Sequence, residues 1–85
     1  MGHRHRQLDY VKIGERLKKG RGKNRTQEEV AESVGCSPNY LSGIECGKKH
    51  VSLELLYRLC TYLGVSMDYV VGGVTLSNGI PVNAP

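Results

Sequence analysis

The sequence predicts an all-α fold, a compact bundle of five helices, and three observations support this. First, apolar residues recur at helical spacing, most clearly at Leu56, Leu59, Cys60 and Leu63. Second, a residue that favours helix starts precedes each periodic segment, and glycine usually follows it. Third, the 85 residues are 39% apolar with no Trp or Phe, which suits one domain with a modest core.

The first two helices are bounded by local signals. Asp9 is expected to cap a helix that runs to about Lys19, followed by a glycine-broken basic loop over residues 20–25. Thr26 is expected to cap the second helix, with Glu29 completing a capping box. Gly35 can then end this helix in the left-handed conformation.

The third helix follows almost at once, which is typical of a helix-turn-helix unit. Ser37 is a suitable N-cap and Pro38 suits the first helical position, while Gly47 stops the helix. Only Leu41 and Ile44 form its apolar face. A short helix with a polar outer face can enter the major groove of DNA, although the spacing alone also fits an ordinary helix that supports the core.

Two more helices and a tail complete the chain. Ser52 and Ser66 are expected to cap the fourth and fifth helices, which Gly64 and Gly72–Gly73 end. In the tail, Asn78-Gly79 between apolar residues indicates a hairpin. Pro81 counts against the hairpin, so a loose or partner-ordered tail is the favoured interpretation.

The charge is unevenly distributed. Residues 1–25 hold nine of the twelve Lys and Arg residues against two acids, a net charge of +7, whereas residues 26–85 carry −3. This asymmetry fits an oriented contact with a polyanion, and it equally fits a solvated charged helix. No apolar run is long enough to cross a membrane, and the polar first residues do not resemble a signal peptide.

The three cysteines, Cys36, Cys46 and Cys60, follow no disulfide spacing and are expected to be reduced thiols in a cytoplasmic protein. A redox switch and a zinc site formed with His50 are weaker alternatives, the zinc site because a structural site usually has four ligands. No cofactor is expected. The sequence also lacks catalytic triads, paired carboxylates and a Walker-type phosphate loop, so no enzyme is predicted.

Residues Thr26 to Gly73 resemble the helix-turn-helix domain of the phage repressor and Cro family, the XRE-type regulators. The resemblance is carried, in order, by Thr26-Gln27, Ala31, Gly35, Ser37, Leu41, Ile44-Glu45, Gly47-Lys48, Ser52-Leu53 and Leu63-Gly64-Val65-Ser66. It implies a lambda repressor-like fold over residues 9–73. Outside this domain, a flexible basic leader is expected at residues 1–8 and a C-terminal tail at residues 74–85.

The resemblance also implies a DNA-binding surface. Exposed recognition-helix positions match Ser37, Pro38, Asn39, Tyr40, Ser42 and Gly43. Asn39 is the strongest candidate for reading a base, and Tyr40 for a phosphate or a thymine methyl. Phosphate contacts are expected from Arg25, Thr26, Gln27, Lys48 and Lys49. Glu45 is expected to pair with Arg21, although the loop after the first helix is shorter than usual.

The predicted function is that of a sequence-specific transcriptional regulator, a repressor that binds a pseudo-palindromic operator in double-stranded DNA as a homodimer. The alternative is an antitoxin-type or protein-interaction module with the same fold. In that case residues 74–85 would recognise a protein partner, because their apolar residues have no evident place in the core.

Overall fold

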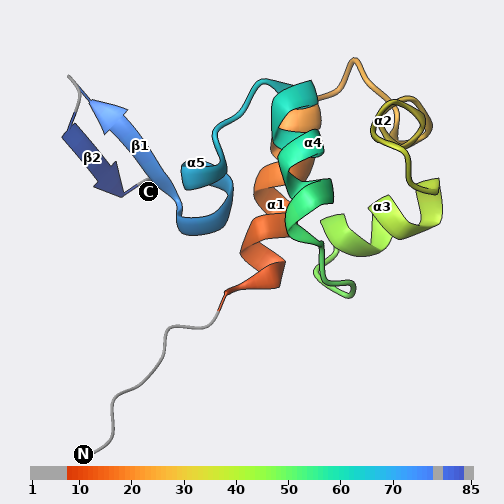
Figure 1. Cartoon of the computed structure of the whole chain (residues 1–85), viewed down its shortest axis with the longest axis horizontal. Coiled ribbons are helices and arrows are strands. Elements are labelled where there is room, and N and C mark those ends of the chain that lie inside the picture. Colours follow the sequence, from red (N-terminus) through yellow and green to blue (C-terminus); the bar gives the residue numbers. More distant parts are fainter. Residues whose placement is uncertain (1–7, 78–79, 84–85) are drawn as a thin grey trace, which may run out of the picture.

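The computed structural model describes residues 8–77 and 80–83 and confirms the five-helix bundle (Figure 1). The helices are α1 (Tyr10–Arg21), α2 (Gln27–Val34), α3 (Pro38–Glu45), α4 (Leu53–Leu63) and α5 (Met67–Gly72). Two strands follow, β1 (Val74–Ser77) and β2 (Ile80–Asn83). Among the described residues, no helix combines the length and apolar composition needed to cross a bilayer. The expected leader over residues 1–8 lies outside the described residues except for Leu8.

The predicted helix starts are all confirmed. Asp9, Ser37, Ser52 and Ser66 each accept a hydrogen bond from the backbone N–H three residues further on. Thr26 and Glu29 form the complete capping box, with bonds of 3.1 and 2.8 Å. Each such cap contributes about 1 kcal/mol, which matters for helices as short as α2 and α3.

One predicted boundary was wrong. Helix α1 does not end near Lys19 but continues through Gly20 and Arg21. Gly20 is a poor helix former, but a tertiary contact of Arg21 with α3, described below, holds this last turn. The basic loop is therefore limited to residues 22–25.

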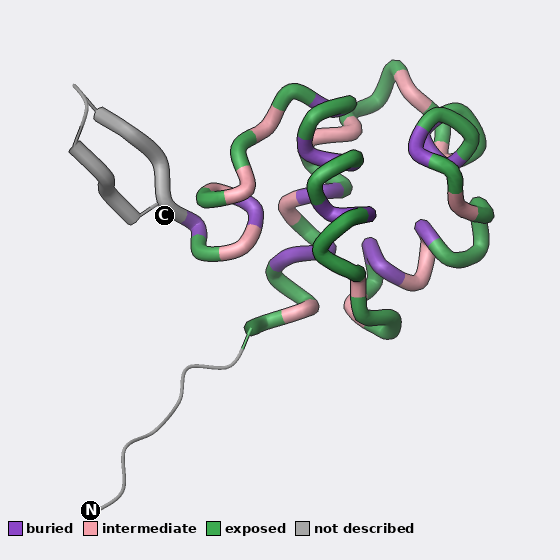
Figure 2. Tube along the Cα trace, viewed as in Figure 1, coloured by how far each residue is buried: buried purple, intermediate pink, exposed green. Residues whose placement is uncertain are grey.

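The core lies between the helices, whose buried sides face one another in Figure 2. Every helix contributes at least one buried apolar side chain, and Cys60 is buried among them. The fully buried larger side chains are Ile13, Leu17, Val30, Leu41, Ile44, Leu59 and Val70. Two of the seven, Leu41 and Ile44, come from α3, and they are the two that the sequence placed inward.

Helices α1 and α3 approach each other closely at Gly14. A Cβ atom at this position would overlap the backbone carbonyl groups of Ile44 and Glu45. Glycine is therefore required for packing rather than for its backbone angles. The contact fixes the C-terminal end of α3 against α1.

The tail forms an antiparallel hairpin, which was the less favoured interpretation of its sequence. Val74 pairs with Asn83, and Ser77 pairs with Ile80. Pro81 pairs with Leu76, and because both strands of a two-stranded sheet are edge strands, proline is compatible with this position. In Figure 1 the hairpin lies beside α5, on the other side of α1 from α3.

Candidate nucleic-acid interface

Helix α3 leaves its N-terminal half on the surface. It begins three residues after the Gly35 turn, where φ is 84° and the backbone is left-handed. Ser37, Pro38, Asn39 and Tyr40 are exposed, as Figure 2 shows for this part of the trace. Further along the helix, Ser42 and Gly43 are half-buried. Four of the six predicted recognition residues therefore lie exposed at the N-terminal end of α3.

The other end of α3 is anchored by a buried polar cluster. Glu45 is 5% exposed and accepts two hydrogen bonds from the Arg21 guanidinium, at 2.8 and 3.0 Å. The Gln27 amide donates a third, at 2.9 Å. The bonds to Glu45 raise the pKa of Arg21 above its ordinary value. The predicted Arg21–Glu45 pair is thus present, and it joins α1, α2 and α3.

Three of the predicted phosphate-contacting residues are used within the protein. The Gln27 amide nitrogen is held by Glu45, which leaves its second hydrogen for another acceptor. The Arg25 guanidinium lies 5.6 Å from the Tyr62 ring and donates to the Tyr62 carbonyl at 3.4 Å. Arg25 therefore packs against the end of α4 and does not extend alongside α3. Thr26 accepts the capping bond from Glu29.

The loop after α3 is built on α3 itself. The carbonyl oxygen of Gly43 accepts hydrogen bonds from the N–H groups of Lys48 and Lys49, at 2.9 and 3.1 Å. The Tyr40 hydroxyl donates to the His50 carbonyl at 2.7 Å. The sequence did not indicate that the His50 ring would stack on Tyr10 of α1, with ring centroids 4.0 Å apart. Lys48 and Lys49 are exposed, so the loop presents two cations beside α3.

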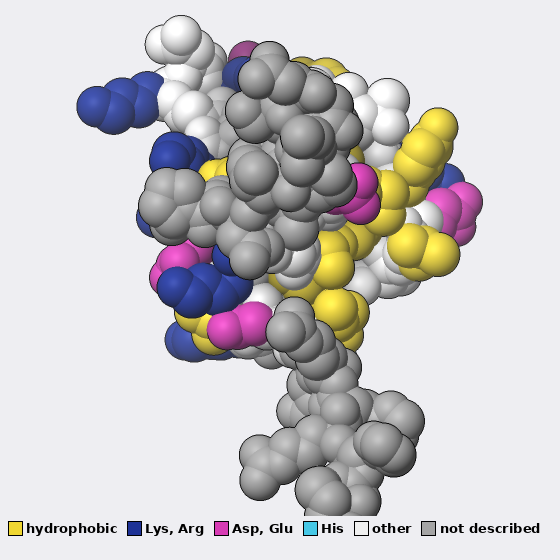
Figure 3. Space-filling model, turned by 90° about the vertical axis from the view of Figure 1, so that its left-hand side faces the viewer, with side chains coloured by type: hydrophobic (Ala, Val, Ile, Leu, Met, Phe, Trp, Pro, Cys, Tyr) yellow, Lys and Arg dark blue, Asp and Glu magenta, His cyan; other side chains and the backbone are white. Residues whose placement is uncertain are grey.

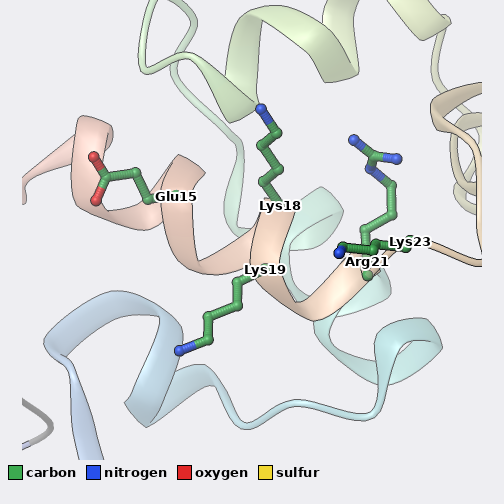
Figure 4. Close-up of a pocket in the computed structure, with 6 residues that line it drawn as sticks. Glu15, Lys18, Lys19, Arg21 and Lys23 are labelled. Carbon is green, nitrogen blue, oxygen red and sulfur yellow. The ribbon is translucent and has the colours of Figure 1, made fainter.

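Half of the ten Lys and Arg residues in the described part of the chain lie on α1, and two more lie in the loop after it. Lys18, Lys19 and Lys23, with Glu15, Arg21 and Gly22, line a shallow hollow along α1 and the residues after it. In Figure 4, Lys18 and Lys19 leave α1 in divergent directions. On the face shown in Figure 3, most of the visible Lys and Arg side chains lie toward the left and most of the visible apolar side chains toward the right. The loop between α3 and α4 contains two of the described cations, Lys48 and Lys49.

The cysteines occupy three different environments. Cys46 is exposed, Cys36 is half-buried and Cys60 is buried, and all three are free thiols. Burial raises the pKa of Cys36 and of Cys60. Within residues 8–77 and 80–83, no three His, Cys, Asp or Glu side chains gather in a way that could hold a metal ion. The zinc and redox alternatives gain no support from this arrangement.

Known proteins resemble this chain in sequence and in structure. A helix-turn-helix family model matches residues 17–70. The transcriptional regulator ClgR of Mycobacterium tuberculosis is 40% identical over 60 residues, which cover 69% of this chain and 54% of the relative. The chain thus spans about half the length of that curated relative.

Two solved structures share the fold. The clp gene regulator ClgR from Corynebacterium glutamicum has a TM-score of 0.70 and 42% identity, covering 75% of this chain and 69% of that one. The P22 c2 repressor protein, in complex with a synthetic operator, has a TM-score of 0.68 and 30% identity, and the match covers 80% of this chain and 98% of that one. These similarities confirm the resemblance to the phage repressors and Cro, and the chain belongs to the helix-turn-helix family.

Proposed function

We propose that this protein is a sequence-specific DNA-binding transcriptional regulator that inserts α3 into the major groove. The observation that carries the proposal is the exposure of residues 37–40 at the N-terminal end of α3, beside the two loop lysines. The major groove is about 12 Å wide and accepts one helix. At the start of α3, Pro38 has no N–H and the Tyr40 N–H donates to Ser37, so the Asn39 N–H and the helix dipole remain to favour nearby phosphates.

Base reading is assigned to the exposed polar side chains of α3. The Asn39 amide can donate to adenine N7 and accept from its N6, which recognises that base. Ser37 accepts its capping bond from the Tyr40 N–H and keeps its hydroxyl hydrogen for a phosphate or a base. The Tyr40 hydroxyl hydrogen is used by His50, so the ring is the part of Tyr40 that remains for a thymine methyl. Pro38 and Ser42 complete this surface.

Phosphate contacts are assigned to residues on both sides of α3. Lys48 is exposed and has no hydrogen-bonded side-chain partner in the described part of the chain, so it suits a phosphate. On the other side, the N-terminal end of α2 offers the second amide hydrogen of Gln27 together with Thr26. Arg25 would have to leave Tyr62 to reach DNA, and we assign it a minor role.

We propose further that the protein acts in the cytoplasm as a repressor, and that two copies bind a pseudo-palindromic operator. The P22 c2 repressor, with 98% of its chain covered, was crystallised with an operator, which supports an operator as the target here. In a two-fold complex the half-sites lie about one helical turn apart, or multiples of it. Occlusion of a promoter by such a complex would account for repression.

The proposed function can be tested by selecting bound duplexes from a random-sequence DNA library with the full chain. We expect one consensus with two inverted half-sites about 10–10.5 base pairs apart, or a multiple of this. Fluorescence anisotropy should then show binding to the consensus at least about 10³-fold tighter than to scrambled DNA. Recovery of unrelated sequences, or equal affinity for consensus and scrambled duplexes, would contradict a sequence-specific function.

The hairpin supports a second role, as a contact with another protein or with a second copy of this chain. A two-stranded hairpin is only marginally stable by itself, and both strands of this one are edge strands. Edge strands can pair with another chain. Removing residues 74–85 should therefore lower the dimer fraction in sedimentation experiments while α1–α5 remain folded. An unchanged dimer fraction and unchanged partner binding would place both contacts elsewhere.

A further inference from the structure

The side chain of Lys49 occupies the space that a side chain at position 43 would fill. A Cβ atom built on Gly43 would lie 2.5 Å from Cγ of Lys49, 3.4 Å from its Cβ and 3.7 Å from its Cδ. The first three carbons of Lys49 therefore lie directly on the α3 backbone at Gly43. The carbon chain of Lys49 thus crosses α3 at Gly43, although the residue belongs to the following loop and is exposed.

Backbone contacts fix this placement. Lys49 donates its N–H to the Gly43 carbonyl, which also accepts from Lys48. The next residue, His50, is held from its other side by the Tyr40 hydroxyl. Because the loop is bonded to α3 before and after the Lys49 side chain, that side chain has a short and well-defined path over Gly43.

Position 43 lies one helical turn after Asn39, on the same face of α3. Residues four apart in a helix are neighbours on its surface. A side chain at 43 would therefore extend the row that Asn39 begins, and Lys49 takes its place. Lysine donates well to O6 and N7 of guanine, which are acceptors in the major groove.

We infer that Lys49 is a specificity-determining residue that contacts a guanine next to the base read by Asn39, and that Gly43 positions it. This inference rests on the proposed function and changes one assignment, because the sequence pattern placed Lys49 among the phosphate contacts. Lys48 is the matched neighbour, since it has the same charge and lies in the same loop, whereas the three atoms nearest to a Cβ at Gly43 all belong to Lys49.

The identity of residue 43 follows from the same contact. The φ angle of Gly43 is not positive, so its backbone conformation is one that alanine also adopts. Glycine within a helix is less favourable than alanine. The glycine is thus explained by the space that Lys49 needs, and Gly43→Ala should displace Lys49 without unfolding α3.

The test compares the specificity of variants on DNA. The wild-type consensus duplex is selected from a random library, and each of its base pairs is then substituted in turn. We expect Lys49→Ala to reduce discrimination at one G·C pair by roughly 5- to 100-fold. Lys48→Ala should weaken binding to every duplex by a similar factor and keep the preference at that pair.

The Gly43 variants separate positioning from folding. Gly43→Ala should reduce discrimination at the same G·C pair, with a melting temperature equal to or above that of the wild type. In the Lys49→Ala background, adding Gly43→Ala should cause no further loss, while Gly43→Lys should restore part of the preference.

Two results would overturn the inference, and they are distinguishable. If Lys49→Ala weakens all duplexes equally and the selected consensus is unchanged, Lys49 contacts phosphates and the proposed function stands. If the wild-type protein selects no consensus at all, the proposed function fails, and the inference fails with it.

Discussion

Replacing Glu45 with alanine tests whether the buried polar cluster holds the helix-turn-helix unit together. The substitution removes a carboxylate that is 2% exposed in its side chain and that accepts three hydrogen bonds. It leaves the Arg21 guanidinium, whose side chain is 14% exposed, with the Arg25 carbonyl as its hydrogen-bonded partner.

The expected loss is large because the half-buried charge of Arg21 loses its counter-ion. Removing one partner of a buried ion pair costs about 3–5 kcal/mol in the free energy of unfolding. Water can reach part of Arg21, so we expect the lower end, about 3 kcal/mol. For a domain of this size that corresponds to a fall in melting temperature of about 12–24 °C.

The measurement is thermal and urea unfolding of the full chain, followed by circular dichroism. Glu54→Ala is the matched control, because the Glu54–Arg58 pair has the same charges but is 77% and 51% exposed. This control should change stability by no more than about 0.5 kcal/mol. A double variant, Arg21→Met with Glu45→Leu, should be less destabilised than either single variant, since no buried charge remains.

Comparable stabilities of Glu45→Ala and Glu54→Ala would refute this reasoning. Such a result would mean that the cluster behaves as a surface ion pair and that the apolar contacts of α3 suffice. The double variant would then offer no rescue, because there would be no penalty to remove.

Four further outcomes are expected. Gly14→Ala should lower the free energy of unfolding by about 1–3 kcal/mol, because the added methyl overlaps backbone carbonyls of α3. Lys48→Ala should reduce the slope of log affinity against log salt by about one unit on specific and non-specific DNA alike. Tyr40→Phe should cost about 0.5–1.5 kcal/mol through the lost bond to His50, measured by urea unfolding. Burial raises the pKa of Cys60, so the folded protein holds the thiol proton more tightly than the unfolded chain does. The Cys60 thiol therefore contributes its full stabilisation below the unfolded-state pKa of about 8.5, and this contribution is lost as pH rises toward the folded-state pKa. The wild-type protein should therefore lose stability with rising pH more steeply than Cys60→Ala, and equal slopes would contradict the assignment.

Local chemistry made the fold predictable from the sequence. The N-cap Ser37 accepts a hydrogen bond from the backbone N–H three residues further on, and Gly35 ends α2 through its own left-handed backbone conformation. Such signals do not depend on the rest of the molecule, which is why every helix start was predicted correctly. The end of α1 could not be predicted in this way, because Arg21 is held in the helix by Glu45, 24 residues further on.

The proposed recognition surface was only partly predictable, for the same reason. The exposure of Asn39 follows from the inward positions of Leu41 and Ile44, which the sequence shows. The position of Lys49 depends on the path of the loop beyond Gly47, whose φ is 78°, and on bonds back to Gly43. Likewise, Arg25 turns toward Tyr62, 37 residues away, and no local pattern indicates that contact.

These contacts explain how so short a helix can serve as the proposed recognition element. Eight residues are too few for an independently stable helix, and two apolar side chains bury little area. The remaining support comes from the C-terminal end of α3, where Glu45 joins α1 and α2 and where the Gly43 carbonyl holds the loop. Because this support lies at one end, the other end can present Asn39 to DNA without losing contacts that the fold requires.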